Sequence, residues 1–188
     1  EDEGPLTDLV AHLADQGHKP YLIPGGASDH PLGSYGYAVC AAEIAAQQAS
    51  LGFAFDTIVH CTGSSSTQSG LLAGLAAFDS ETRVIGVPDD EETEIKKARV
   101  ERLANAALED LGASQRVASA DVEIVVGDAS PYGVSDATTF DAIGLLARTE
   151  GLIADPVYEG KAVRGLIDLA RAGRFRPSSN VLLMHLGG

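Results

Sequence analysis

Short apolar runs alternate along this chain with longer segments of helical periodicity, and this alternation is the strongest constraint on its fold. The runs at 56–61, 83–87, 122–126 and 181–184 are rich in Val, Ile and Leu, without the every-second-residue polarity of a half-exposed strand. Strands that are apolar throughout and are separated by helices form parallel sheets covered on both faces. We therefore predict an α/β fold of three layers, with a parallel sheet between two layers of helices.

The intervening segments have apolar residues at helical spacing. Helices are predicted at about 35–50, 68–77, 100–111, 138–149 and from Tyr158 onward, and an earlier one at 6–13 that ends at Gly17. The apolar run 21–23 is predicted to be a strand that leads into a loop. Two helices have a clear core-facing side, formed by Val100, Leu103, Ala104, Ala107, Leu108 and Leu111 in one and by Val163, Leu166, Ile167 and Ala170 in the other.

Charge excludes several classes of partner. The chain has 13 basic against 27 acidic residues, a formal net charge of −14, whereas binding to nucleic acid requires clustered Lys and Arg. The same charge disfavours anionic membranes, and no apolar run is long enough to span a bilayer. The acidic run from Asp89 to Glu94 is predicted to be a solvated helix N-terminus, where carboxylates suit the helix dipole.

Cysteine and histidine spacing favours a reduced protein without a metal. Only Cys40 and Cys61 occur, and no CxxC pair is present, so we expect two reduced thiols in a cytoplasmic protein. No set of His, Cys, Asp and Glu has the spacing of metal ligands.

The segment from Thr62 to Thr67 follows a predicted strand and precedes a predicted helix. In parallel α/β sheets, ligands collect at the carboxyl ends of the strands, and a helix N-terminus favours an anion. The segment matches neither GxxxxGK[ST] nor GxGxxG, which disfavours ATP and dinucleotides. From spacing alone, a polar turn without a ligand is an equally good interpretation. The candidate phosphate-binding residues are Thr62, Gly63, Ser64, Ser65, Ser66 and Thr67.

Four segments carry a resemblance to one enzyme family. They are SDHPLG at 28–33, CTGSSSTQSG at 61–70, DPVYEGK at 155–161 and HLGG at 185–188. These segments resemble the 1-aminocyclopropane-1-carboxylate (ACC) deaminases and the related D-cysteine desulfhydrases, which depend on pyridoxal 5'-phosphate (PLP). The resemblance runs from about Lys19 to Gly188. It implies the fold type II of PLP enzymes, like the tryptophan synthase β subunit, with PLP held between a large and a small domain.

The resemblance also implies that part of the family's enzyme is absent. Family members are roughly twice as long, and this chain aligns with their later part. Residues 1–188 are therefore expected to be mainly a large-domain portion, without the N-terminal segment that bears the Schiff-base lysine. The only lysines here are Lys19, Lys96, Lys97 and Lys161, and none lies in the family's lysine context. Lys161 is expected to have a structural role in the first turn of a helix.

The resemblance assigns roles to three catalytic candidates. Glu159 matches the glutamate that keeps the pyridine nitrogen of PLP protonated, which strengthens the cofactor as an electron sink. Tyr158 matches a tyrosine proposed to act on the cyclopropane ring as nucleophile or base, and Tyr132 matches a second active-site tyrosine. Without the resemblance, Glu159 would be an ordinary acid in a first helical turn. For Tyr132, an ordinary half-buried tyrosine remains an open alternative.

Three histidines in or next to these segments receive mainly structural interpretations. His60 belongs to a buried strand and is interpreted as a core residue. His30 could be a base oriented by Asp29 or a loop contact, and His185 is expected near the rim of the cofactor site.

Substrate identity rests on positions that point in two directions. Glu159 and the Asp29-His30 pair favour the deaminase, because the desulfhydrases usually have threonine at 159 and lack Asp-His. In contrast, residues 135–138 replace the usual Pro-Asn-Glu-Gly, Ala27 replaces a common cysteine, and Gly63–Ser66 is closer to the desulfhydrase arrangement.

We expect a PLP-dependent deaminase that, when complete, opens the ring of ACC to give 2-oxobutyrate and ammonia. Two alternatives stay open: a D-cysteine desulfhydrase that gives pyruvate, sulfide and ammonia, and a catalytically inactive truncated relative. The expected partners are a small amino-acid substrate and either further copies in a homo-oligomer or a separate chain that supplies the Schiff-base lysine.

Overall fold

The computed structural model describes residues 4–22, 30–89 and 92–187. Within these ranges, four parallel strands form one sheet in the order β3-β2-β1-β4. The regular elements, in chain order, are α1 (Gly4–Asp15), α2 (Leu32–Leu51), β1 (Thr57–Thr62), α3 (Ser66–Ala77), β2 (Arg83–Pro88), α4 (Thr93–Asp110), the 3-10 turn η2 (Ser119–Asp121), β3 (Glu123–Ile124), α5 (Ala137–Glu150), α6 (Glu159–Arg171) and β4 (Val181–Leu183).

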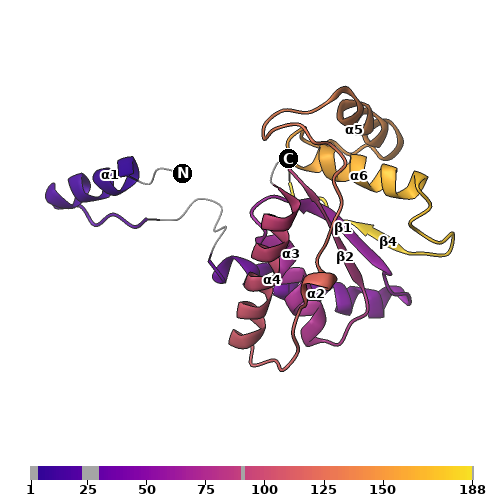
Figure 1. The fold of residues 1–188 in the computed structure, drawn as a ribbon, viewed down its shortest axis with the longest axis horizontal. Helices are drawn as coiled ribbons and strands as arrows, with labels where there is room; N and C mark the ends of the chain where they lie inside the picture. The colour runs from indigo at the N-terminus through magenta and orange to yellow at the C-terminus, as the bar shows by residue number, and fades with distance from the viewer. Residues whose placement is uncertain (1–3, 23–29, 90–91, 188) are drawn as a thin grey trace.

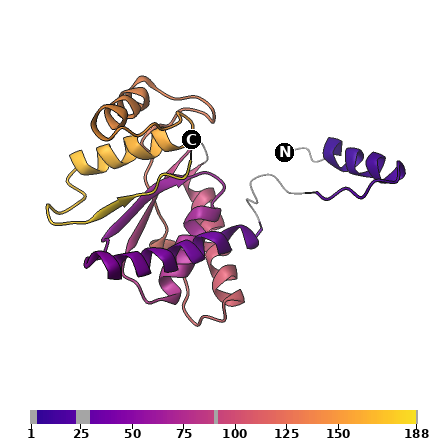
Figure 2. The same ribbon diagram turned by 180° about the vertical axis from the view of Figure 1, so that it is seen from behind.

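Helices cover both faces of the sheet. In Figure 1, α2, α3 and α4 lie on one side of the strands and α5 and α6 on the other, and Figure 2 shows the same arrangement from behind. Successive residues of β1 point to opposite cores, so Ile58 packs with α2, α3 and α4 while Val59 packs with Leu169 of α6. The predicted three-layer parallel fold is therefore confirmed.

Close contact between α2 and α3 depends on two glycines. A methyl group at Gly70 would lie 2.2 Å from the carbonyl oxygen of Ser34, and one at Gly74 would lie 2.6 Å from that of Ala38. The hydroxyls of Ser34 and Ser69 are hydrogen-bonded across the same contact at 2.7 Å. Helix α3, which begins at the candidate phosphate-binding segment, is consequently held against α2 at backbone distance.

The sequence-based predictions differ from the structure at a few positions. Tyr21 and Leu22 are not in a strand and are 88% and 46% exposed, because no described strand lies beside them to complete a hydrogen-bonded pair. Ile23 lies outside the described residues. β3 covers only two residues of the predicted 122–126 strand, and Val126 beyond it is exposed. Leu111 and Ala170, predicted to face the core, are exposed at the ends of their helices.

The order of the strands reverses beside β1. β2 and β3 follow one another on one side of β1, whereas β4 returns to its other side. In open α/β sheets such a switch point leaves a crevice at the carboxyl ends of the two strands. The topology therefore predicts a ligand crevice between the segments that follow β1 and β4.

None of the described helices is both long and apolar enough to cross a lipid bilayer.

The contact between α2 and α3 gives a prediction for stability. Gly70→Ala should lower the free energy of unfolding by about 1–3 kcal/mol, because its methyl group meets backbone that cannot move alone. Gly36→Ala, in α2, is the matched control, because a methyl group there would have no neighbour within 4 Å. Removing this helix glycine should stabilise the fold by about 0.5–1 kcal/mol. Urea unfolding measures both, and equal midpoints for Gly70→Ala and the unmodified chain would contradict the packing argument.

Candidate functional site

A cleft of about 290 Å³ opens at the carboxyl ends of β1 and β4, where the topology predicts it. Segments far apart in the sequence meet there: the turn after β1, the start of α6 and the segment after β4. The residues that line the cleft are Tyr37, Cys61, Gly63, Ser64, Thr67, Tyr158, Glu159, Leu186 and Gly187.

The predicted phosphate-binding segment forms the turn from β1 into α3. Gly63, Ser64 and Thr67 line the cleft, whereas Thr62, Ser65 and Ser66 are buried beside it. We call residues 62–67 the cradle. The first N–H groups of a helix have no partner within the helix, so the start of α3 directs N–H donors toward the cradle. The predicted position of this segment between a strand and a helix N-terminus is confirmed.

Ser65 of the cradle has an unusual backbone conformation. Its φ of 71° lies in the left-handed region, which costs a residue other than glycine about 1–3 kcal/mol. The hydroxyl groups of Ser65 and Thr62 are buried and have no hydrogen-bond partner among the described residues. Backbone strain and buried polar atoms without partners are typical of binding and catalytic sites. Both features therefore make the cradle a candidate binding site.

Asp155 fixes the start of α6, which carries two of the catalytic candidates. Its carboxylate accepts hydrogen bonds from the N–H groups of Val157, Tyr158 and Glu159 at 2.7, 2.8 and 2.9 Å. Gly160 follows without a side chain, where a methyl group would lie 2.8 Å from the Asp155 carbonyl oxygen. The DPVYEGK segment therefore folds into a capped turn that holds the backbone of Tyr158 and Glu159 in place.

Glu159 is a buried acid in the wall of the cleft. Only 2% of it is exposed, and Oε1 accepts one hydrogen bond from the Leu186 N–H at 3.2 Å. Oε2 is buried without a hydrogen-bond partner in the described part of the chain. Burial raises the pKa of Glu159 above its usual range, although the Leu186 N–H and the nearby His185 oppose the shift.

Tyr158 and Tyr132 are in direct contact. Their hydroxyl groups are hydrogen-bonded to each other, and their rings meet edge to face with centroids 5.9 Å apart. The hydrogen bond with Tyr132, followed by burial, raises the pKa of Tyr158 to about 12. Tyr158 lines the cleft, whereas Tyr132 is not among the lining residues. The structure therefore brings the two tyrosines together, with Tyr158 as a neutral phenol at pH 7.

Asp128 anchors the loop that carries Tyr132. Its carboxylate accepts hydrogen bonds from the N–H groups of Ser130 and Asp136 and from the Thr139 hydroxyl, at 2.8, 3.0 and 2.6 Å. Burial alone would raise the pKa of Asp128, but these hydrogen bonds outweigh it and hold the pKa well below its usual value. Asp136, in the segment that departs from the family pattern, caps α5 by accepting from the Thr139 N–H at 2.8 Å.

No lysine lines the cleft among the described residues. Lys96 and Lys161 are buried, and their ammonium groups donate to backbone carbonyls. Lys97 pairs with Glu94 at 3.8 Å.

The histidines mostly fit their structural interpretations. His60 is fully buried in β1 and bonds its own strand through Nδ1, and burial lowers its pKa to about 4. His30 accepts from the Leu32 N–H at 3.2 Å, which is a loop contact, while Asp29 and Ala27 lie outside the described residues. His185 is hydrogen-bonded to the Ile153 carbonyl at 2.8 Å. In the sequence it directly precedes Leu186, which lines the cleft.

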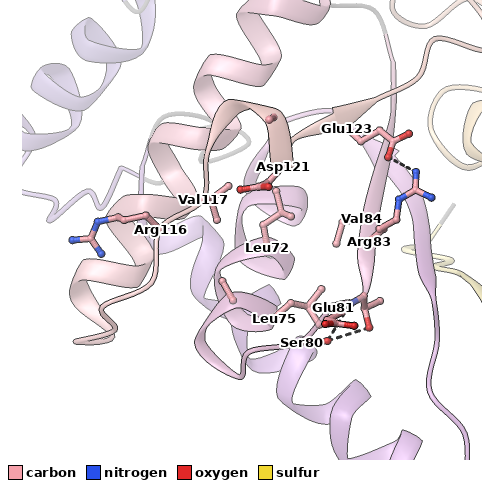
Figure 3. Close-up of a pocket in the computed structure, with 13 residues that line it drawn as sticks. Leu72, Leu75, Ser80, Glu81, Arg83, Val84, Arg116, Val117, Asp121 and Glu123 are labelled. Carbon is pink, nitrogen blue, oxygen red and sulfur yellow. Dashed lines mark hydrogen bonds and ion pairs between the residues drawn. The ribbon is translucent and has the colours of Figure 1, made fainter.

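A second cavity, of about 380 Å³, opens near the amino end of β2 (Figure 3). Two of its five charged lining residues, Arg83 and Glu123, form an ion pair of 2.6 Å. None of the buried, unpartnered polar atoms in the described chain belongs to a residue that lines it. The smaller cleft at the cradle is therefore the better candidate site.

Sequence reasoning missed several residues around the cleft. Cys61 lines it, and burial strongly raises the pKa of this thiol, which favours its protonated form at pH 7. Asp89, predicted to be solvated, is 5% exposed and pairs with Lys96 at 3.1 Å. The available signal was position, since Asp89 follows β2 at the same sheet edge as the cradle.

Comparison with known proteins shows a similarity that covers almost the whole chain. A curated relative from Burkholderia vietnamiensis, a 1-aminocyclopropane-1-carboxylate deaminase, is 42% identical over 182 residues, 96% of this chain and 54% of its own length. A protein of the same name from Rhizobium leguminosarum is 44% identical over the same shares. The chain thus spans about half the length of the curated relatives it matches.

Solved structures agree with the fold. The crystal structure of an ACC deaminase homologue superposes with a TM-score of 0.83 and 32% identity, covering 100% of this chain and 56% of that one. An O-ureido-L-serine synthase superposes with a TM-score of 0.56 at 19% identity, which supports the fold alone. The family model for pyridoxal-phosphate dependent enzymes matches residues 2–187. The chain therefore belongs to the family of pyridoxal-phosphate dependent enzymes, with the type II fold.

Proposed function

We propose that this chain binds PLP in the cleft between the cradle and Glu159 and contributes to a deaminase that opens the ring of ACC to 2-oxobutyrate and ammonia. The observation that carries the proposal is Glu159, a buried carboxylate whose Oε2 has no partner in the described chain although it lies in the wall of the cleft. An unpartnered buried acceptor of this kind fits a ligand with a positively charged N–H. The names of the curated relatives support the reaction.

The residues of the cleft fit PLP at both of its ends. The half-buried Gly63, Ser64 and Thr67 and the N-terminus of α3 offer N–H and hydroxyl donors to a phosphate. Glu159 would hold the proton of the pyridine nitrogen. When bound, PLP supplies an electron sink for the carbanion that forms on the substrate.

Tyr158 is proposed to act on the substrate from the same wall of the cleft. Because its pKa is raised to about 12, its hydroxyl holds a proton at pH 7 and hydrogen-bonds with Tyr132. A cation or the bound cofactor nearby would be needed before Tyr158 could act as a base. Until then, this pair is suited to orienting the substrate and donating a proton.

We further propose that the chain is the large-domain portion of the enzyme and works in the cytoplasm, where its two free cysteines would stay reduced. The Schiff-base lysine would come from outside the described residues, on a separate chain or segment, and self-association is a second possibility. Two features support docking of further protein: α1 has no buried residue, and β4 is an edge strand.

D-Cysteine desulfhydration remains the second candidate reaction. The segment 135–138, which departs from the deaminase pattern, contacts the turn that carries Tyr158, because the Ser135 hydroxyl donates to the Pro156 carbonyl two residues before Tyr158. The departure of this segment from the family pattern, next to the turn of Tyr158, is a reason to test both substrates.

The first test is the absorbance spectrum of the chain with PLP, before and after addition of ACC, together with equilibrium dialysis. We expect PLP to bind, and we expect a near-visible band that shifts with ACC only when a lysine-bearing partner is added. Reduction with borohydride and peptide mapping should leave Lys96 and Lys161 unmodified, because both ammonium groups are buried and hydrogen-bonded. Failure of PLP to bind by dialysis would overturn the cofactor proposal.

Glu159→Gln should separate cofactor binding from stability. Burial disfavours the charged carboxylate, so its raised pKa costs stability above the unfolded value of 4.5, and the cost vanishes below it. The variant without PLP should therefore be more stable than the unmodified chain at pH 7 and equally stable at low pH. It should bind PLP about tenfold more weakly or worse, because a hydrogen bond to a charged group is lost. Thermal unfolding across pH and dialysis measure the two effects, and stabilisation that persists below pH 4.5 would contradict the first.

Glu159→Thr tests the choice of substrate in the enzyme completed by its lysine-bearing part. Ring opening depends more on a protonated pyridine nitrogen, so the variant should lose more activity with ACC than with D-cysteine. Rates of formation of 2-oxobutyrate and pyruvate measure this difference. Equal losses would count against the role proposed for Glu159.

A further inference from the structure

Two buried lysines lie behind the walls of the cleft and have no part in the chemistry described above. Lys96 of α4 is 1% exposed and Lys161 of α6 is fully buried. A buried ammonium group is costly unless it is paired or hydrogen-bonded, so its contacts define what it stabilises. Both lysines contact the segments that form the site.

Lys96 holds the peptide that joins Gly63 and Ser64 in the cradle. Its Nζ donates to the Gly63 carbonyl at 2.7 Å and to Asp89 Oδ1 at 3.1 Å. The same carboxylate lies directly against the Gly63 backbone, because a methyl group at Gly63 would be 2.8 Å from Asp89 Oδ2. Gly63 is thus held on one side by an ammonium and a carboxylate that neutralise each other.

This contact sets the direction of a donor in the cradle. The carbonyl and the N–H of one trans peptide unit point in opposite directions. With the Gly63 carbonyl fixed on Lys96, the Ser64 N–H is turned away from Lys96. Ser64 lines the cleft and Lys96 does not, which fits an N–H that faces the side from which a phosphate would approach.

Lys161 connects the same point to the loop 128–136, which carries Tyr132 and is called the tyrosine loop below. Its Nζ donates to the carbonyl of Asp89 and to that of Ser130, the latter at 2.9 Å. Ser130 lies two residues before Tyr132, whose hydroxyl bonds Tyr158. Lys161 itself follows Glu159 by two residues, so it joins the end of β2, the tyrosine loop and the start of α6.

We propose that Lys96, Asp89 and Lys161 form a lysine brace that positions the cradle for binding the phosphate end of the cofactor and holds the tyrosine loop beside Tyr158. The three act as positioning residues, through Gly63 and Ser130, and none touches the ligand. The inference rests on the proposed function for its ligand, whereas the brace itself can be tested without any ligand. It also explains why both ammonium groups are unavailable as a covalent attachment point for PLP.

Lys96→Met tests the brace, and Lys97→Met is the matched control. Lys97 is the next residue of the same helix and pairs only weakly, at 3.8 Å, with Glu94. Without ligand, Lys96→Met should speed amide hydrogen exchange in the segment 62–67 about tenfold, the effect of losing a hydrogen bond to a charged donor. Lys97→Met should leave that exchange within about twofold of the unmodified chain. Unchanged exchange in folded Lys96→Met would overturn the brace.

Ligand binding gives a second readout that a general loss of stability would not produce. Lys96→Met should weaken binding of PLP about tenfold while leaving pyridoxal, which lacks the phosphate, within about twofold. Equal weakening of PLP and pyridoxal would overturn the role at the phosphate. If the unmodified chain binds neither compound, the proposed function fails, and the exchange experiment still decides the brace.

The unmodified chain provides a test that does not depend on folding of a variant. Acetylation by acetic anhydride, followed by peptide mapping, should modify Lys19 and Lys97 at least about tenfold faster than Lys96 and Lys161, because the latter pair is buried. Acetylation of Lys96 as fast as Lys97 would overturn the brace.

Discussion

The position of the carboxyl end of β1 determines where the residues of the candidate site meet. The strand is buried along its whole length and pairs with β2 on one side and β4 on the other. Parallel strands end at the same edge of a sheet, so the cradle after β1, Asp89 after β2 and Leu186 after β4 meet there although they are far apart in sequence. Glu159 joins them because α6 packs on the same strands. A change that shifted β1 along its neighbours would therefore disperse the whole site.

The polar groups around this edge differ in how well they are satisfied. Lys96 and Lys161 donate to backbone carbonyls, and Asp155 and Asp128 each accept three hydrogen bonds. In contrast, Glu159 Oε2 and the Ser65 hydroxyl are buried without a partner in the described chain. An unsatisfied buried group costs about 1–3 kcal/mol, a large fraction of the stability of a typical domain. The satisfied groups build the scaffold, and Glu159 Oε2 is the unsatisfied atom in the wall of the cleft that a ligand would complete.

Much of this arrangement could be predicted from the sequence, because it depends on local patterns. Apolar runs predicted the strands of the sheet, and helical spacing predicted the helices that cover it. The position of 62–67 between a strand and a helix placed the cradle at the carboxyl edge of the sheet. The failures are tertiary in origin. Tyr21 and Leu22 have strand composition but no neighbouring strand. Asp89 lies in an acidic run that resembles a solvated helix start, yet Lys96, seven residues later, buries it. Periodicity does not show which charges will be paired across a fold.

The residues that line the cleft and the two buried lysines would have different roles in holding a cofactor. The cleft offers backbone, hydroxyl and carboxylate groups, and the two buried lysines face into the scaffold. The proposed site would therefore recognise the phosphate and the ring nitrogen of PLP without forming a bond to its aldehyde. Recognition of this kind depends on how rigidly the donors are held, because each donor that must be ordered on binding reduces the affinity. A brace that fixes the cradle before binding reduces this ordering cost for the backbone N–H groups of the cradle. The two buried lysines would then position the groups that bind the cofactor. The covalent step would depend on an amine from outside the described residues.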